Sequence, residues 1–383
     1  MRALPVSRRM AAWALLGAAL AAGCGPTSKR LRQELRQGAA GTYIAGVPFV
    51  AQRRERCGPA ALASVARFYG LETTEEAIAR QVYLPSIGGT LTVDLRRCAR
   101  ELGLWSWSGR GSADDVRTWL DRGVPMIALL RQGLLAGGGN HYVVVTGYHG
   151  GRGYFLAHVG HLPNRPISFR RFARRSREAG GWMLAACPPE AVRWPLSAEG
   201  HNRLGLLLER AGKLERALAE YRQAVAAGGR NAIFHFNRGN VLARLGRREE
   251  AEEAYRRAIA LQPACADAHN NLASLLLDAG RLHEALHEAR RAVAAGGVHT
   301  ACYHDTLGRA LLAHGDFEEA ARAFRRAIAD AAPDAPLATE ARLGLIEALA
   351  RGGHGAAAAA ERDRLAATAA DPALRRRAAR PLE

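Results

Sequence analysis

Three residues stand where their types and spacing could support nucleophilic chemistry. Cys57 lies five residues after Gln52 and 84 residues before His141. A cysteine in the first turn of a helix feels unpaired backbone N–H groups and the positive end of the helix dipole, which predicts a lowered thiol pKa. A histidine can pair with the thiolate and later protonate a leaving amine. The amide of Gln52 and the backbone N–H of Cys57 are candidate donors to an oxyanion.

The segments around these residues predict the elements that must position them. Pro59 fits the first turn of a helix, because its missing N–H loses no bond there. Apolar spacing predicts helices over 57–69, 75–82 and 93–102, and short apolar runs predict strands over 124–130, 141–145, 154–157 and 182–185. His141 opens one of these strands, after three glycines. Residues 42–190 therefore read as an α+β domain with an antiparallel sheet.

The set of Gln52, Cys57-Gly58-Pro59 and the run from His141 to Tyr148 resembles family 39 of the cysteine peptidases. These are papain-like peptidases that remove double-glycine leaders from bacteriocins, together with free-standing relatives. The resemblance spans roughly residues 44–188. It implies a papain-like fold with Cys57 as nucleophile, His141 as base and acid, and Gln52 as oxyanion donor. It implies a protein or peptide substrate and no cofactor.

One position departs from the family pattern. The family places an aspartate on the strand after the histidine strand, and His158 occupies that position here. A neutral histidine can accept a hydrogen bond from His141, but it cannot stabilise imidazolium as a carboxylate does. Asn164 is another candidate for this orienting role, whereas Asp114 and Asp115 lie on a predicted helix and fit it less well.

The second half of the chain repeats itself. Gly205, Gly239, Ala273, Gly308 and Gly344 are spaced 34, 34, 35 and 36 residues apart. Alanines and bulky residues keep the same register, and a glycine precedes the second helix of each pair, where a tight turn favours positive φ. This pattern resembles the tetratricopeptide repeat. It predicts an all-α solenoid over 196–370, with four clear repeats and a degraded fifth, followed by a tail over 371–383. The resemblance implies that the repeats bind a protein or peptide partner.

The N-terminus reads as an export signal. Three arginines precede an uncharged stretch over 10–22, and the sequence Leu20-Ala21-Ala22-Gly23-Cys24 resembles a bacterial lipobox. We expect cleavage of residues 1–23, lipidation of Cys24 and a tether over 24–41. Gly25 in place of aspartate implies an outer-membrane anchor that faces the periplasm. An ordinary secretory signal with a coincidental cysteine is the alternative.

Composition excludes several classes of protein. Six cysteines in 383 residues exclude a disulfide scaffold, and the single near-membrane-length run excludes a polytopic membrane protein. The formal charge of +18 arises almost wholly from dispersed arginines, and no basic segment is interleaved with aromatics, so we expect no nucleic-acid partner. The histidines lack metal spacing, and no phosphate-binding glycine loop is present. We expect buried or reduced thiols at Cys98, Cys187, Cys265 and Cys302, with a disulfide among them left open.

These observations predict a lipid-anchored periplasmic cysteine peptidase whose repeats recruit a partner. Two alternatives stay open. The domain could bind peptides without cutting them, which the departure at His158 favours and the intact Cys57, Gln52 and His141 oppose. A thiolate enzyme could also transfer its acyl group to an amine instead of water.

Overall fold

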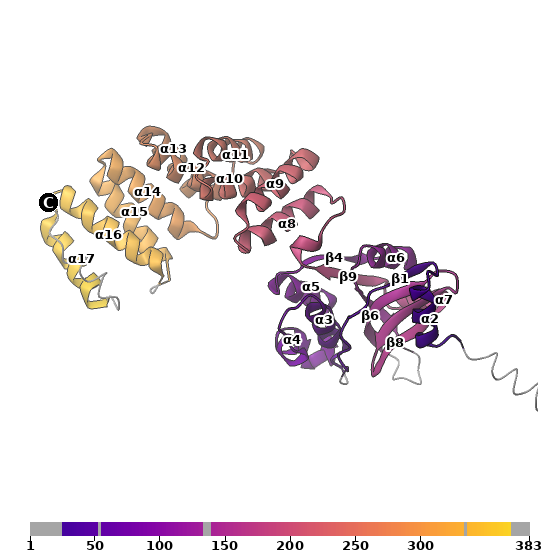
Figure 1. Ribbon diagram of the computed structural model, residues 1–383. Helices are drawn as coiled ribbons and strands as arrows, with labels where there is room; N and C mark the ends of the chain where they lie inside the picture. The colour runs from indigo at the N-terminus through magenta and orange to yellow at the C-terminus, as the bar shows by residue number, and fades with distance from the viewer. Residues whose placement is uncertain (1–24, 53–54, 133–138, 333–334, 369–383) are drawn as a thin grey trace, which may run out of the picture. The chain divides into compact units, whose positions relative to one another are not determined.

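A computed structural model describes residues 25–52, 55–132, 139–332 and 335–368. The chain divides into two compact units, the first ending at Trp194 and the second beginning at Pro195. The predicted order, an α+β region followed by all-α repeats, is confirmed (Figure 1). Within the described part of the chain, no helix has the length and apolar character that a membrane span requires.

An antiparallel seven-stranded sheet forms the centre of the first unit. Its strands run in the order β4-β9-β5-β6-β7-β8, and β1 pairs with β6. The strands are β1 (Gly41–Tyr43), β4 (Trp105–Arg110), β5 (Met126–Arg131), β6 (Asn140–His149), β7 (Tyr154–Val159), β8 (Leu162–Ser168) and β9 (Trp182–Cys187); the short β2 (Tyr83–Leu84) and β3 (Gly89–Thr90) form a separate hairpin.

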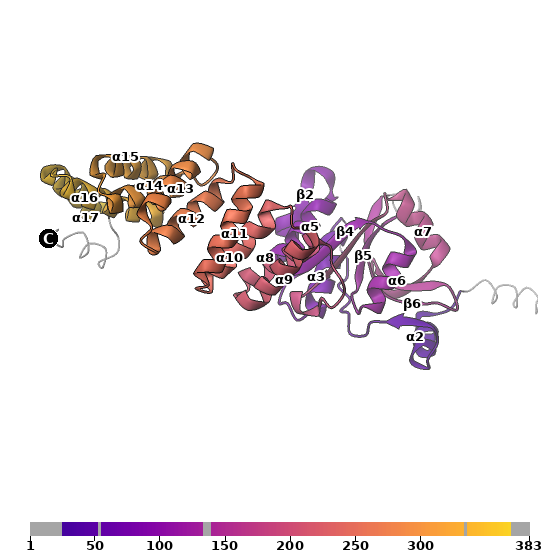
Figure 2. The ribbon, with the colours of Figure 1, turned by 90° about the horizontal axis from the view of Figure 1, so that it is seen from above.

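Helices cover both faces of this sheet. They are α2 (Ser28–Arg36), α3 (Cys57–Phe68), α4 (Glu75–Val82), α5 (Thr92–Glu101), α6 (Ala113–Asp121) and α7 (Phe169–Glu178). Figure 2 shows α3 and α5 on one side of the sheet and α7 on the other. The core on the α3 side contains Leu62 and Leu95 from the helices and Ile127, Tyr142 and Val144 from the sheet. Alternate residues of β6 thus hold α3 in place.

The predicted tether over 24–41 is wrong for most of its length. Thr27 caps α2 by accepting a hydrogen bond from the backbone N–H of Arg30, and Leu31 of this helix is fully buried. Glu34 accepts two hydrogen bonds from Arg152, at 2.5 and 2.7 Å, and its carboxylate lies 3.1 Å from Nε2 of His149. One buried leucine and one ionic cluster therefore attach α2 to the sheet, although the segment is polar overall. Cys24 lies outside the described residues.

In the part of the second unit that the structure describes, the helices form five pairs. They are α8 (Ala198–Arg210) with α9 (Leu214–Gly228), α10 (Ala232–Arg244) with α11 (Arg248–Leu261), α12 (Ala266–Asp278) with α13 (Leu282–Ala295), α14 (Thr300–His314) with α15 (Phe317–Asp330), and α16 (Pro336–Arg351) with α17 (Gly355–Thr368). The turn glycines Gly212, Gly246 and Gly280 have φ of 72°, 75° and 72°, as the repeat pattern predicts.

The repeated glycines bring the two helices of a pair together. A Cβ at Gly205 would lie 2.6 Å from the ring of Tyr221, and one at Gly239 would lie 2.6 Å from the ring of Tyr255. Gly308 meets Phe324 in the same way, at 2.7 Å. Only a residue without a side chain allows the aromatic ring of the second helix to pack against the backbone of the first.

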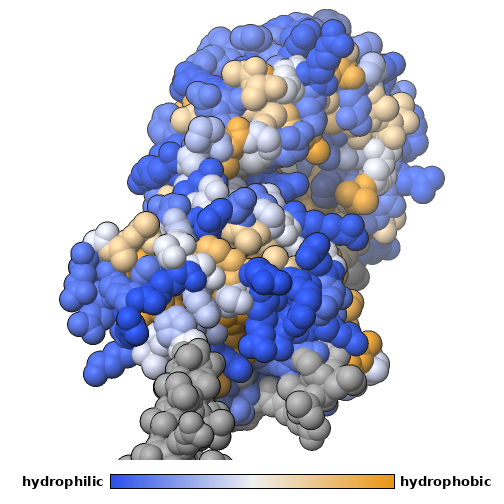
Figure 3. Space-filling model, turned by 90° about the vertical axis from the view of Figure 1, so that its right-hand side faces the viewer, coloured by the Kyte–Doolittle hydropathy of each residue, from blue (hydrophilic) through white to orange (hydrophobic). Residues whose placement is uncertain are grey.

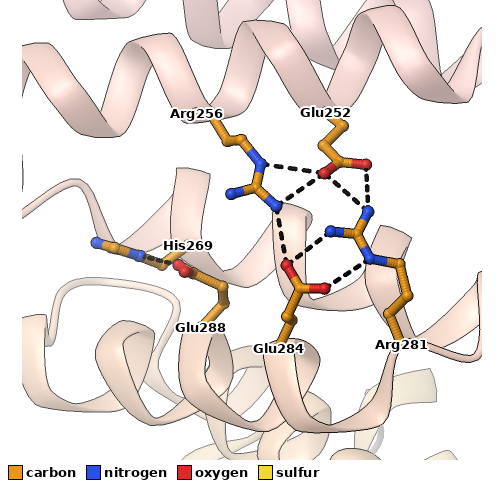
Figure 4. Close-up of polar contacts among 6 residues, drawn as sticks. All are labelled: Glu252, Arg256, His269, Arg281, Glu284 and Glu288. Carbon is orange, nitrogen blue, oxygen red and sulfur yellow. Dashed lines mark hydrogen bonds and ion pairs between the residues drawn. The ribbon is translucent and has the colours of Figure 1, made fainter.

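Charged residues also connect successive pairs. Arg281 donates to Glu252 at 2.8 Å and to Glu284 at 2.6 Å, and Arg256 bridges the same two carboxylates (Figure 4). These hydrogen bonds with Arg281, and then those with Arg256, lower the pKa of Glu284. The network links α11 to the start of α13, while Nδ1 of His269 on α12 lies 2.6 Å from Glu288 on α13.

Candidate active site

Cys57 is the first residue of α3, as predicted. The helix begins after Arg56, and its residues from Gly58 to Ala66 are all buried. The thiol Sγ accepts a hydrogen bond from the backbone N–H of Tyr142 on β6, at 3.5 Å. The start of α3 is therefore joined to the strand that begins with Asn140 and His141.

Gly58 explains why a glycine follows the cysteine. A Cβ at this position would lie 3.1 Å from Cβ of Thr90 and 3.2 Å from the ring of Tyr142. The same ring packs edge-on against Trp182, with centroids 5.7 Å apart, and its hydroxyl donates to the carbonyl of Thr90 at 3.0 Å. Tyr142 thus fixes the distance between the first turn of α3 and the sheet. The sequence motif contains Tyr142, but its type alone did not reveal this role.

Gln52 is buried beside the backbone of Tyr142, with 4% of its surface exposed. Its side-chain amide donates to the carbonyl of Tyr142 at 3.1 Å and accepts from the backbone N–H of Gly160 at 3.0 Å. A carboxamide has two N–H donors, so one remains beyond the bond to Tyr142. Cys57 and Gln52, which lie on separate segments, therefore both bond to the backbone of the residue that follows His141.

His141 lies at the start of β6, opposite Leu130 of β5. Its Nε2 is buried and has no hydrogen-bond partner among the described residues. Burial lowers the pKa of His141 to about 4, so the imidazole is neutral at pH 7. The described residues show no hydrogen bond between His141 and Cys57. The thiol nevertheless lies near the histidine in the fold, because it bonds to the backbone of Tyr142, the next residue in the chain.

The thiol pKa shifts in the opposite direction to the sequence prediction. Burial raises the pKa of Cys57, and the backbone N–H groups of Tyr142, Gly58 and Cys57 oppose this rise without overcoming it. The helix terminus does act as expected, but removal of the sulfur from water outweighs it. The resting site therefore holds a neutral thiol and a neutral imidazole.

The predicted contact between His158 and His141 is not formed. His158 pairs with Val144, three residues further along β6 than His141. Its Nδ1 accepts from the backbone N–H of Asn164 at 3.1 Å, and its Nε2 lies 3.1 Å from the carbonyl of Val47. Both ring nitrogens thus bind backbone groups, so His158 is a neutral, buried structural histidine.

The alternative orienting residue is also engaged elsewhere. The side-chain oxygen of Asn164 accepts from the hydroxyl of Thr146 at 2.8 Å. Within the described residues, neither Asn164 nor an acidic side chain bonds to His141. Among the described residues, therefore, none fills the third catalytic role that the family pattern assigns.

Glu55, two residues before Cys57, was not identified from the sequence. Its φ of 68° lies in the left-handed region, which is unfavourable for a glutamate. Tyr83 donates a hydrogen bond to its carboxylate at 3.0 Å, and Arg56 stacks over the ring of Tyr83. Contacts with the β2–β3 hairpin therefore hold a strained turn directly before the cysteine.

The other sequence predictions concern cysteines and metals. Cys57, Cys98, Cys187, Cys265 and Cys302 are all free thiols. Among the described residues, no group of three or more histidine, cysteine or acidic side chains is arranged to hold a metal ion.

Comparison with known proteins finds a family match in each of the two units. Residues 44–159 match the Peptidase_C39 like family, and residues 190–232, 202–262, 236–298 and 306–375 match tetratricopeptide repeats. A search of the curated proteins finds no match.

Several solved structures resemble the chain. They include MamA from Desulfovibrio magneticus RS-1, with 20% identity and a TM-score of 0.40 over 44% of this chain and 92% of that one. YrrB, described as a TPR protein with an unusual peptide-binding site, has 21% identity and a TM-score of 0.41 over 46% of this chain and 89% of its own. The family matches, together with the fold, show that this chain joins a Peptidase_C39-like domain to an array of tetratricopeptide repeats.

Proposed function

We propose that the first unit is a cysteine peptidase in which Cys57 is the nucleophile and His141 the general base. The observation that carries this proposal is the shared backbone of Tyr142. Its N–H bonds to Cys57, its carbonyl bonds to Gln52, and His141 precedes it. Two of the three residue types that acyl transfer requires therefore bond to the backbone of Tyr142, and the third, His141, is the residue directly before it.

The protonation states favour a general-base route over a preformed ion pair. As the sulfur attacks a peptide carbonyl carbon, the thiol proton passes to the unpartnered Nε2 of His141. The backbone N–H of Cys57 and the second N–H of Gln52 stabilise the oxyanion. The imidazolium then protonates the leaving amine as the C–N bond breaks, and water hydrolyses the thioester with the proton returning to sulfur.

Alkylation with iodoacetamide tests this assignment. The alkylation rate of Cys57 should fall in His141→Ala, because the thiol loses its base, whereas the rates at Cys265 and Cys302 should not change. Site occupancy is read by peptide mass spectrometry over time. A Cys57 rate that is the same in the wild type and in His141→Ala would reject a Cys57–His141 pair. Release of a peptide with a new amine at its end would identify acyl transfer in place of hydrolysis.

A non-catalytic peptide-binding domain is the second candidate. The raised pKa of Cys57 and the engagement of His158 and Asn164 with other groups favour it. In that case a peptide should bind with the same affinity to the wild type and to Cys57→Ala, and neither protein should cut it. Cleavage by the wild type alone would eliminate this candidate.

We also propose that Cys24 carries a lipid anchor at the outer membrane. The exposed face of α7 supports a location near an anionic surface. It carries Arg170, Arg171, Arg174 and Arg177, and α7 has one acidic residue, Glu178. Figure 3 views the side on which α2 and α7 lie in Figure 1, where hydrophilic side chains predominate. Cys24→Ser should release the protein into the soluble fraction; unchanged sedimentation with membranes would reject lipidation.

A further inference from the structure

The last repeats contain a groove lined by both apolar and charged side chains. Helices α12, α14 and α16 lie side by side, since α14 contacts both of the others. Between them is a groove of about 800 Å³. Leu277, Leu312, Leu337 and Leu343 supply apolar walls, and the buried Phe324 closes part of it. The groove has the size of a site for one or two side chains of a bound peptide.

Asp305 is the unusual residue in this groove. It lies on α14, and only 9% of its surface is exposed. Its carboxylate makes no hydrogen bond or ion pair within the described residues. Burial raises the pKa of Asp305; the charge of Arg309 lowers it, and that of Glu340 raises it further. Asp305 lines the groove, so a cation that enters there can pair with this largely buried carboxylate and offset the cost of its burial.

The other charges of the groove define what that partner can be. Four carboxylates line it, from Asp278, Asp305, Glu340 and Glu347, against the two guanidinium groups of Arg309 and Arg351. Arg351 already pairs with Glu347 at 3.4 Å and stacks over the ring of Phe317. The groove is therefore net negative in a chain whose formal charge is +18. A cation on an aliphatic stem satisfies both the acidic floor and the apolar walls.

We propose that this groove binds a lysine or arginine side chain of a peptide segment, with Asp305 as its ion-pair partner. The inference rests on the proposed function, because it specifies the class of partner that the repeats bring to the peptidase-like unit. It assigns specificity to the last repeats and to a side chain that the peptidase chemistry does not use.

Binding can be measured without catalysis, on the full chain carrying Cys57→Ala. The probes are fluorescent dodecapeptide pools with random flanks and a fixed central residue: lysine, arginine, norleucine or glutamate. Fluorescence anisotropy should give affinities for the lysine and arginine pools at least tenfold above those for norleucine and glutamate, because only the cationic side chains form a charge-assisted hydrogen bond with Asp305. Norleucine keeps the aliphatic stem and removes only the charge.

Asp305→Asn should abolish this preference. Asp330→Asn, an exposed change in the same repeat and outside the groove, should leave it intact. Thermal unfolding checks the fold, and Asp305→Asn should unfold at the same or a higher temperature because it removes an unpaired charge. Equal affinities for the lysine, arginine and norleucine pools, or a preference that persists in Asp305→Asn, would overturn the proposal. Cys57 alkylation in the otherwise native chain reports the peptidase assignment separately.

Discussion

Both units pack a glycine against an aromatic ring, but the two residues are separated by very different numbers of residues in the sequence. In the repeats, Gly205 meets Tyr221, Gly239 meets Tyr255 and Gly308 meets Phe324, each pair 16 residues apart. In the first unit, Gly58 meets Tyr142, 84 residues away. The contact in the repeats is local and recurs at a fixed period, so it can be predicted from the sequence. The active-site contact is non-local and depends on the whole sheet.

The largest effect is expected in the first unit, whose site depends on residues far apart in the chain. His141→Ala should reduce peptide hydrolysis by about 10²- to 10⁴-fold, because the thiol loses the base that takes its proton. His161→Ala changes an exposed histidine of the same unit. It serves as the control and should leave the rate unchanged. Single-turnover hydrolysis of a peptide substrate measures both. A loss of less than threefold in His141→Ala would contradict its role as base.

A substitution at His158 tests whether this position orients His141, as the family pattern implies, or only bonds to the backbone, as the structure shows. His158→Asp restores the family acid, yet it should not raise the alkylation rate of Cys57, because position 158 bonds to Val47 and Asn164. It should cost about 1–3 kcal/mol of unfolding free energy, since a carboxylate cannot donate to the Val47 carbonyl. His158→Asn, which keeps a donor and an acceptor, should cost less in urea unfolding. Faster alkylation in His158→Asp would show that this position does reach His141.

In the repeats, a larger residue at the glycine position should destabilise the packing of the aromatic ring. Gly239→Ala places a Cβ 2.6 Å from the ring of Tyr255, and overpacking of this kind costs about 1–3 kcal/mol, partly offset by about 1 kcal/mol of helix propensity. Gly58→Ala, with its nearest contact at 3.1 Å, should cost less. Urea unfolding compares the two. The cost of Gly239→Ala should shrink in a Tyr255→Leu background, and an equal cost in both backgrounds would refute the ring contact as its cause.

The smallest effect is expected at the N-terminal helix. Hydrogen bonds from Arg152, aided by those from Arg30, lower the pKa of Glu34 to about 2. The contribution of Glu34 is therefore complete above its ordinary pKa of about 4.5 and is lost as the pH falls from there towards 2. Hydrogen exchange should show that α2 loses protection in this window before the sheet does. Glu34→Gln should weaken α2 protection at pH 6 and remove most of the pH dependence.

Local signals predicted much of the architecture. The start of α3, the bounds of α4 and the repeat period follow from spacing and turn residues. Helix α7 was missed because it carries five arginines and buries only Phe172 and Ser176. Strand β8 was missed because Pro163 and Pro166 interrupt it. The polar segment that forms α2 owes its position to one leucine and to Arg152, which lies far along the chain.

The site was predicted in its residues but not in its electrostatics. The sequence places Cys57 at a helix start, where the dipole lowers the thiol pKa. It does not show that Tyr142 and the sheet remove the sulfur from water, which raises that pKa. The role of His158 could not be read from its alignment with the family acid, because the register of β6 against β7 and the turn at Asn164 decide which groups its ring meets.

The attachment of Cys57 and Gln52 to the backbone of a single residue, Tyr142, has an evolutionary consequence. Since Tyr142 recruits Cys57 and Gln52 through its N–H and carbonyl, most side-chain replacements in β6 would leave their spacing unaltered. An inserted or deleted residue between Val143 and Val145 would instead displace His141 by one step and turn its ring to the opposite surface of the sheet. We therefore expect lineages of this domain to vary freely in strand composition and to keep its length constant.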